Sequence, residues 1–372
     1  MKTITHPVDQ ELSYPFSIPY ENILFFDIET TGFSADYCAL YLIGALYYDS
    51  EKWTVIQWFA DDFKSEKALL EAFLNFSKNY THLIHFNGTG FDLPFLEKKC
   101  KAHHIDSFSS TLGAMEQVDL YKAIFPFKKK LVLENFKQKT IEDFLGIHRT
   151  DRFSGKELIS VYQSYMKETK KDLPETQEME ELLLLHNRDD LVGMLQFSSL
   201  LSFVDLLNGE PCFQHISCQT VDSVFLLEAQ LPFSFLESYV AASENFYLQI
   251  QQNTIQLAVP ILHRELKYFY PNPKDYYYLP EEDQAIHKSV SSFVEKSFRQ
   301  KATKDNCYIR KQDSYIPVFG NQFCFALFYE NSKKEQPYIA LNEEFSETPK
   351  HLVSYFTSFL QNAKDLHITK EA

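Results

Sequence analysis

The sequence predicts an α/β protein in which a mixed sheet is flanked by helices, followed by a C-terminal α+β accessory domain. Short apolar runs with strand character alternate with helical patterns in the first half of the chain, as expected of an α/β sheet. Residues 118–206 are mainly helical in pattern, and strand patterns prevail after residue 211. The length of 372 residues exceeds the size at which one hydrophobic core usually stops growing, so two domains are expected.

Four strands and two helices are expected in the first hundred residues. The strands are apolar and aromatic runs bounded by polar or turn-forming residues: 21–27, 39–48, 53–59 and 81–87. One helix is expected to begin after Ser65, because leucine and phenylalanine recur at helical spacing up to residue 76. Another is expected over 92–101, with Pro94 in its first turn. This order of elements indicates a mixed sheet with helices packed on it.

Helices are expected to dominate the next segment. A helix over 140–145 should end at Gly146, and a long helix is expected over 178–206. The run DLLNGEP (205–211) is the best domain boundary, since Gly and Pro stop a helix. We therefore expect an N-terminal extension over 1–19, a first domain over 20–206 and an accessory domain over 211–372, whose role the sequence does not indicate.

The accessory domain is predicted to mix strands and helices. Its expected strands are 225–229, 246–251, 254–262, 265–269, 323–329 and 337–341, with a helix as the alternative for 225–229. Its expected helices are 281–296 and 348–362. The segment 246–262 looks like a hairpin that turns at Gln252 and Asn253.

Composition and charge bear on the cellular location of the protein and on the partners that it can bind. Hydrophobic residues make up 45% of the chain, no signal segment is visible, and the six cysteines form no CxxC pair, so a cytoplasmic protein without membrane association is expected. The net charge of −15 alone argues against a nucleic-acid partner. Residues 98–171, however, contain 15 Lys and Arg against 9 Asp and Glu. This local excess is either a cationic groove or a solvated basic face.

Asp27 and Glu29 follow a buried apolar run and lie two residues apart on a predicted strand, so both point to one face. Two carboxylates there are costly unless they are paired or bound to a metal. The chain contains its own control, because Asp49 and Glu51 have the same spacing but fall in a turn, where we expect both to be solvated. The position after a buried strand, rather than the spacing, therefore marks the first pair as a candidate metal clamp.

Two further segments carry candidate residues. Asp92 follows HFNGTGF, where glycines allow close backbone approach to a ligand, although an N-cap role for Asp92 is the alternative. Asn87 could bind substrate or cap the turn. His186 and Asp190 are four residues apart on a predicted helix and share one face, unlike Asp189, which lies about 100° around the helix. A lone pair of this kind is more often structural, but beside other acids the histidine becomes a candidate general base.

Together, these segments resemble the motifs of the DEDD, or DnaQ-like, 3′–5′ exonucleases of the ribonuclease H-like superfamily. DIETTGF, HFNGTGFDLPF and HNRDD match the three motifs in order, and LGIHRTDRFSGKELISVY (145–162) is similar to the YprB-type ribonuclease-H-like domain. The resemblance covers roughly residues 20–205. One feature departs from the pattern: histidine-type members place His five residues before the last Asp, whereas His186 lies four before Asp190. Whether His186 acts as the base or only orients water is left open.

The resemblance implies a ribonuclease H-like sheet and a two-metal hydrolysis of single-stranded DNA or RNA that releases nucleoside 5′-monophosphates. The implied ligands of two Mg²⁺ or Mn²⁺ ions are Asp27, Glu29, Asp92 and Asp190, with His186 as the fifth catalytic residue. The implied substrate-binding residues are Thr30, Thr31, Gly32, Asn87 and Phe91. An inactive nucleic-acid-binding protein on this fold and a phosphodiesterase for short oligonucleotides are the alternatives. The sequence does not choose between DNA and RNA and names no protein partner.

Overall fold

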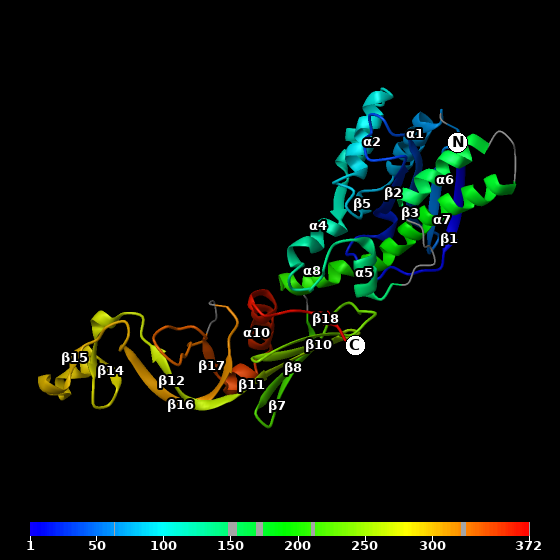
Figure 1. Cartoon of the computed structure of the whole chain (residues 1–372). Helices are drawn as coiled ribbons and strands as arrows, with labels where there is room; N and C mark the ends of the chain where they lie inside the picture. The colour runs from blue at the N-terminus through cyan, green and yellow to red at the C-terminus, as the bar shows by residue number, and fades with distance from the viewer. Residues whose placement is uncertain (63, 148–154, 169–173, 210–212, 321–324, 372) are drawn as a thin grey trace. The chain divides into compact units, whose positions relative to one another are not determined.

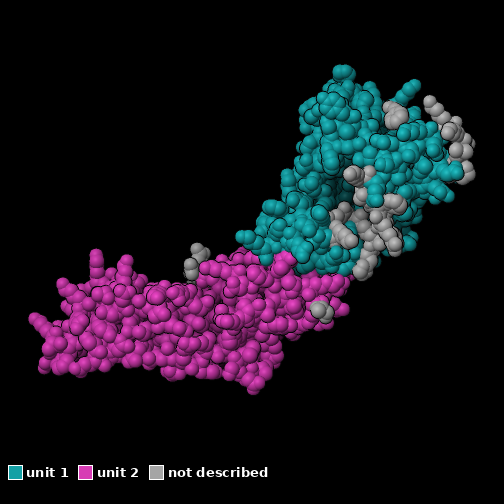
Figure 2. All heavy atoms as spheres, in the orientation of Figure 1, with its two compact units in different colours: residues 1–129, 133–204 teal, residues 130–132, 205–372 magenta. Residues whose placement is uncertain are grey.

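The structure is a computed structural model of the whole chain, and it describes all residues except 63, 148–154, 169–173, 210–212, 321–324 and 372. The chain divides into two compact units (Figure 2). Unit 1 comprises Met1–Lys129 and Leu133–Val204, and unit 2 comprises Lys130–Val132 and Asp205–Ala372.

Unit 1 contains a mixed six-stranded sheet of order β1-β4-β3-β2-β5-β6 (Figure 1). Its strands are β1 (Lys2–Val8), β2 (Ile23–Thr30), β3 (Leu40–Asp49), β4 (Lys52–Phe59), β5 (His82–His85) and β6 (Glu116–Asp119). The first four pair antiparallel, whereas β2, β5 and β6 run parallel. The predicted mixed sheet is confirmed. Strand β1 falls in the segment expected to be an extension, and it lies instead at the edge of this sheet.

Helices flank the sheet of unit 1, as the sequence predicts. They are α1 (Glu66–Ser77), α2 (Asp92–Ala102), α3 (Phe108–Thr111), α4 (Leu120–Ile124), α5 (Gln138–Leu145), α6 (Gly155–Glu168) and α7 (Pro174–Phe197). Helix α8 (Leu200–Asn208) begins in unit 1 and ends in unit 2. Helix α5 ends at Gly146, whose φ of 72° is left-handed, as expected of a glycine that ends a helix.

The expected single helix over 178–206 is interrupted between α7 and α8. The hydroxyls of Ser198 and Ser199 donate to the carbonyls of Leu195 and Gln196, at 2.6 and 2.7 Å. Such side-chain bonds compete with the helical backbone ladder, which accounts for the break.

The segment Glu175–Asn208 is long and apolar enough to cross a membrane by composition, but 78% of its most apolar window is buried inside the fold, as in a core helix.

Unit 2 is rich in antiparallel strands. A six-stranded sheet has the order β18-β9-β10-β11-β8-β7, with strands β7 (Gln214–Val221), β8 (Val224–Gln230), β9 (Tyr239–Ser243), β10 (Phe246–Gln251), β11 (Thr254–Pro260) and β18 (Thr369–Lys370). Two three-stranded sheets contain β12 (Leu262–Phe269), β16 (Tyr308–Pro317) and β17 (Tyr338–Ala340), and β13 (Tyr276–Leu279), β14 (Gln284–His287) and β15 (Gln300–Lys301). The helices are α9 (Glu343–Ser346) and α10 (Pro349–Asn362). The predicted hairpin at Gln252 and the terminal helix are confirmed.

Two predictions for unit 2 are wrong in whole or part. The expected helix over 281–296 is instead β14 followed by a 3₁₀ helix, Lys288–Phe293. Its apolar residues Val290 and Phe293 are exposed, so the segment has no buried apolar stripe to hold an α-helix against the unit. In the expected strand over 323–329, residues 323 and 324 lie outside the described residues, and Phe328 and Tyr329 form only isolated bridges.

Candidate metal centre

Strand β2 presents Asp27 and Glu29 on one face. Phe26, Ile28 and Thr30 are buried, whereas the two acids between them are only half-buried, so the alternation predicted from the sequence is present. The control pair behaves as expected, because Asp49 and Glu51 are exposed at the turn between β3 and β4.

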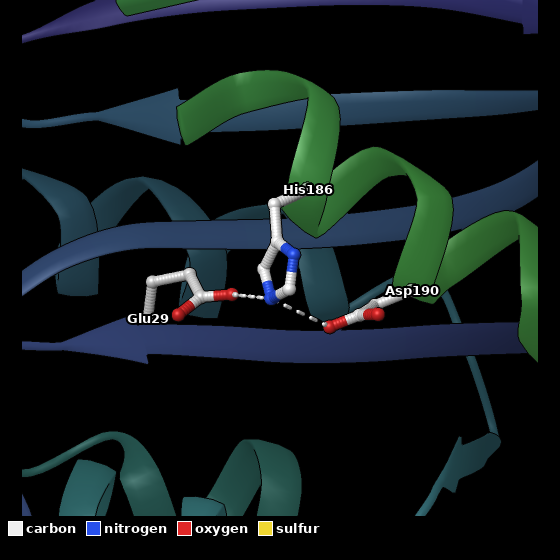
Figure 3. Close-up of side chains that lie close together, drawn as sticks. All are labelled: Glu29, His186 and Asp190. Atoms are coloured by element: carbon white, nitrogen blue, oxygen red, sulfur yellow. Dashed lines mark ion pairs between the residues drawn. The ribbon is translucent and has the colours of Figure 1, made fainter. Parts of the chain in front are cut away.

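Helix α7 brings His186 and Asp190 to this strand (Figure 3). The Nε2 atom of His186 lies 3.7 Å from Oε1 of Glu29 and 3.5 Å from Oδ2 of Asp190, so the imidazole sits between two carboxylates. The ligand atoms of the three residues all lie within 4.8 Å of one another, the one such group found in the described part of the chain. Residues about 160 positions apart in the sequence therefore meet at one point.

Electrostatics link Asp27 and Asp92 to the same cluster. Burial raises the pKa of Asp27 well above its ordinary value, and the charges of Asp190, Glu29 and Asp92 raise it further. Burial also raises the pKa of Asp92 to about 7, against hydrogen bonds from backbone amides that lower it. The N-cap position of α2 belongs to Phe91, so Asp92 is the first helical residue rather than the cap.

The side chains fit a divalent cation. The charges of Asp190, Glu29 and Asp92 raise the pKa of Asp27 because ionised carboxylates repel one another, and a bound cation removes that repulsion. Carboxylate oxygens are also the ligands that Mg²⁺ and Mn²⁺ prefer. The four acids that the sequence predicts as ligands are thus all half-buried or buried and belong to one electrostatic cluster.

Asn187, which the sequence analysis did not select, positions the carboxylate of Asp27. Its Nδ2 donates to Oδ2 of Asp27 at 2.9 Å, and its Oδ1 accepts from Nε2 of Gln57 on β4 at 2.9 Å. Gln57 also donates to the carbonyl of Leu184 at 2.9 Å, which ties α7 to the sheet one turn before Asn187. Asn187 and Gln57 are both fully buried.

A glycine makes this close approach of helix and sheet feasible. Gly44 on β3 pairs with Asp27 on β2. A Cβ atom at Gly44 would lie 2.0 Å from Oδ1 of Asn187 and 2.6 Å from a methyl group of Leu191. The signal in the sequence is a glycine inside the apolar run LYLIGALYY, because glycine in a strand interior often marks close approach of another segment.

A family model described as the RNase H superfamily, RNase_H_2, matches residues 24–202, the segment that carries every residue of this cluster. Residues 24–202 are an RNase H superfamily domain. The match confirms the ribonuclease H-like, YprB-type resemblance of the motifs. No curated protein matches the chain in sequence.

Solved structures similar to this chain include a DNA polymerase and an exonuclease. The family B DNA polymerase of the archaeon Pyrobaculum calidifontis is 13% identical with a TM-score of 0.41, over 64% of this chain and 38% of the polymerase. E. coli exonuclease I in complex with a dA16 oligonucleotide is 16% identical with a TM-score of 0.27, over 46% and 45%. The zinc-bound complex of that enzyme with single-stranded DNA is 14% identical with a TM-score of 0.28, over 61% and 54%. The chain therefore spans between 38% and 54% of these proteins.

The loop after β2 in the RNase H domain is held by its own threonines. The hydroxyl of Thr30 donates to the carbonyl of Gly32 at 2.9 Å, and the hydroxyl of Thr31 accepts from the amide of Ala39 at 2.8 Å. These two predicted substrate residues thus make structural hydrogen bonds in the loop. Phe33, which the sequence analysis did not select, follows them and is 92% exposed.

Asp119, at the end of β6, organises the loop that precedes Asp92. Its carboxylate accepts from the amide of Asn87 at 2.9 Å and from the hydroxyl of Thr89. Asn87 itself is exposed, with a φ of 61°. Phe91 is half-buried, and its ring lies 5.9 Å from that of Phe33 in an edge-to-face arrangement. An exposed amide and two aromatic rings therefore lie on the loop that follows the acids of β2 and on the loop that precedes Asp92 of α2.

The basic stretch 98–171 is only partly available for binding. Its first lysines are paired: Lys98 with Asp36 at 2.9 Å, Lys99 with Glu66 at 2.8 Å and Lys101 with Glu97 at 2.7 Å. Arg149 and Arg152 lie outside the described residues, and so does the side chain of Lys139. The lysines at 122, 128, 129, 137 and 167 make no ion pair with any residue that the structure describes, so these described cations are free to contact a ligand.

Proposed function

We propose that this protein is a metal-dependent 3′–5′ exonuclease that hydrolyses phosphodiester bonds of single-stranded nucleic acid and releases nucleoside 5′-monophosphates. The observation that carries the proposal is the meeting of Glu29, His186 and Asp190 within 4.8 Å. Asp27 and Asp92 belong to the same electrostatic cluster. An RNase H superfamily domain supports the proposal, because three of its separated segments supply these side chains.

Two divalent ions, Mg²⁺ or Mn²⁺, would be held by the carboxylates of Asp27, Glu29, Asp92 and Asp190. When bound, such ions lower the pKa of the attacking water and stabilise the leaving 3′ oxygen. The protein supplies a rigid frame for them, since buried Asn187 fixes one oxygen of Asp27.

We propose that His186 accepts the proton of the attacking water or orients that water. Its Nε2 lies 3.7 Å from Oε1 of Glu29 and 3.5 Å from Oδ2 of Asp190, within the cluster where the attacking water would be activated. His186 lies four residues before Asp190 rather than five as in histidine-type enzymes, yet its side chain still lies beside Glu29 and Asp190. A substrate strand would enter past the loops that carry Phe33 and Phe91, where an exposed ring can stack on the terminal base.

The test is an assay on single-stranded DNA and RNA with Mg²⁺ or Mn²⁺, comparing the wild type with Asp27→Ala. We expect the wild type to release nucleoside 5′-monophosphates, EDTA to stop the reaction and the variant to lose at least 100-fold in rate, roughly as when a group acting in the transition state is removed. A wild type that binds the strands without cleaving them under any of these conditions would indicate a non-catalytic binding protein. Cleavage of a dinucleotide but not of a long strand would indicate an oligonucleotide-specific enzyme.

A further inference from the structure

Three aromatic rings gather around the short helix α4. The ring centroids of Tyr121 and Phe125 are 5.8 Å apart, and each lies 5.2 Å from the ring of Phe136. Phe125 is 52% exposed, in the 3₁₀ helix Phe125–Phe127 that follows α4. The exposed ring of Phe125 is continuous with the half-buried rings of Tyr121 and Phe136, and contiguous apolar surface of this kind can mark a ligand site.

Unpaired lysines border the same rings. The Nζ atom of Lys128 lies 5.8 Å from the ring centroid of Phe136, and Lys122 and Lys129 are exposed. Within unit 1, residues 118–129 and 133–137 carry four lysines and two acids, and one of these acids, Asp119, is buried and hydrogen-bonded to backbone amides. In a chain of net charge −15, this is a cationic surface with aromatic rings inside it. We refer to Tyr121, Lys122, Phe125, Lys128, Lys129 and Phe136 as the α4 patch.

The topology places the α4 patch beside the metal centre. Strands β2, β5 and β6 are parallel neighbours, so their carboxyl ends lie at one edge of the sheet. Asp27 lies near the end of β2, and α4 begins directly after β6, two strands away. At ~4.8 Å per strand, this is a separation of about 10 Å. Phe86, which follows β5 between them, contacts the ring of Tyr121 with centroids 5.8 Å apart.

We propose that the α4 patch binds the part of a single strand that lies 5′ of the scissile bond. Bases stack on the rings of Phe125 and Phe136, and the lysines contact the phosphates. This combination of rings and cations is how proteins hold single strands without sequence preference. The inference rests on the proposed function, and it assigns the substrate as a strand several nucleotides long rather than a dinucleotide.

The experiment measures binding and cleavage separately in the full chain. Binding of a fluorescently labelled 20-nucleotide strand is followed by anisotropy in EDTA over a range of salt concentrations. Hydrolysis of the p-nitrophenyl ester of thymidine 5′-monophosphate, a phosphodiester too short to reach the patch, reports the metal centre alone. The variants are Phe125→Ala and the double change Lys128→Gln with Lys129→Gln.

Matched controls leave the patch intact. Tyr247→Ala removes an aromatic ring that is 44% exposed on β10. Lys52→Gln with Lys78→Gln removes two exposed lysines that lie away from the carboxyl ends of β2, β5 and β6. Lys52 begins β4, and Lys78 follows α1. These controls separate a specific contact from a general effect of ring or charge loss.

We expect Phe125→Ala to weaken strand binding about tenfold, as for loss of one base–aromatic stack. The double lysine variant should lower the slope of log affinity against log salt by about 1.4, or ~0.7 for each phosphate contact in a single strand. Both variants should hydrolyse the ester at the wild-type rate. Binding and slopes equal to the wild type, or equal losses in the controls, would overturn the proposal. If the patch variants show the expected binding losses but the wild type cleaves neither substrate, the exonuclease function is refuted and the patch is still supported as a strand-binding site.

Discussion

Replacing Gly44 by alanine should damage the metal centre without touching any acidic side chain. The new Cβ would lie 2.0 Å from Oδ1 of Asn187, whereas ordinary contact begins at 3.4 Å, so the neighbour must move by about 1.4 Å. If Asn187 rotates away, Asp27 loses the hydrogen bond that orients it. If α7 moves instead, His186 recedes from Glu29.

The size of both effects can be estimated. Overpacking of a dense core typically costs about 1–3 kcal/mol, and each kcal/mol lowers the Tm of a domain of this size by roughly 2–4 °C, so we expect a fall of about 2–12 °C. Displacement of a catalytic group by about 1 Å can cost ~100-fold in rate, which sets the expected loss of kcat/KM.

The assay compares thermal unfolding and strand hydrolysis of Gly44→Ala with those of Gly113→Ala. At Gly113 a Cβ would meet its nearest atom at 3.8 Å, an ordinary contact, so this control should resemble the wild type. The reasoning is refuted if Gly44→Ala melts and cleaves like the wild type. Equal losses in both variants would also refute it, because the close approach of α7 would then not be the cause.

Three further predictions follow from the same cluster. Asn187→Ala should lower kcat/KM by about 10–100-fold and raise the metal concentration needed for half-maximal rate, as when a partner of a metal ligand is lost, whereas Asn79→Ala at an exposed turn should do neither. Without metal, the Tm should fall as pH rises from about 4 to 8, because burial raises the pKa of Asp92 to about 7 and the folded protein therefore favours the protonated carboxyl group. A Tm that rises over this pH range would contradict this expectation. Adding Mg²⁺ or Mn²⁺ should raise the Tm more at pH 8 than at pH 5, and Asp92→Asn should reduce this difference, both measurable by thermal-shift titration.

Local periodicity was sufficient to predict which acids share a face. Alternation along a strand selects Asp27 and Glu29, and the four-residue spacing on a helix selects His186 with Asp190, so both pairs depend on contacts within one element. Asp49 and Glu51 have the same spacing but are exposed. The buried apolar run that precedes Asp27, rather than the spacing, therefore distinguishes the candidate metal ligands.

Contacts between elements could not be predicted in this way. The link from Gln57 through Asn187 to Asp27 joins β4, α7 and β2, and nothing in the spacing of these residues indicates that they meet. The break after α7 has a local cause, since the hydroxyls of Ser198 and Ser199 bond to the preceding turn. The apolar pattern of the helix outweighed that signal in the prediction.

The central claim is that acids from β2, α2 and α7 form one metal centre that shortens a strand from its 3′ end. The most direct measurement compares Asp190→Asn with Asp189→Asn, one residue apart on α7, using a 5′-labelled single strand and Mn²⁺. We predict progressively shorter labelled products from the wild type and from Asp189→Asn, and none from Asp190→Asn. Release of labelled mononucleotide at the start, or full activity of Asp190→Asn, would contradict the account.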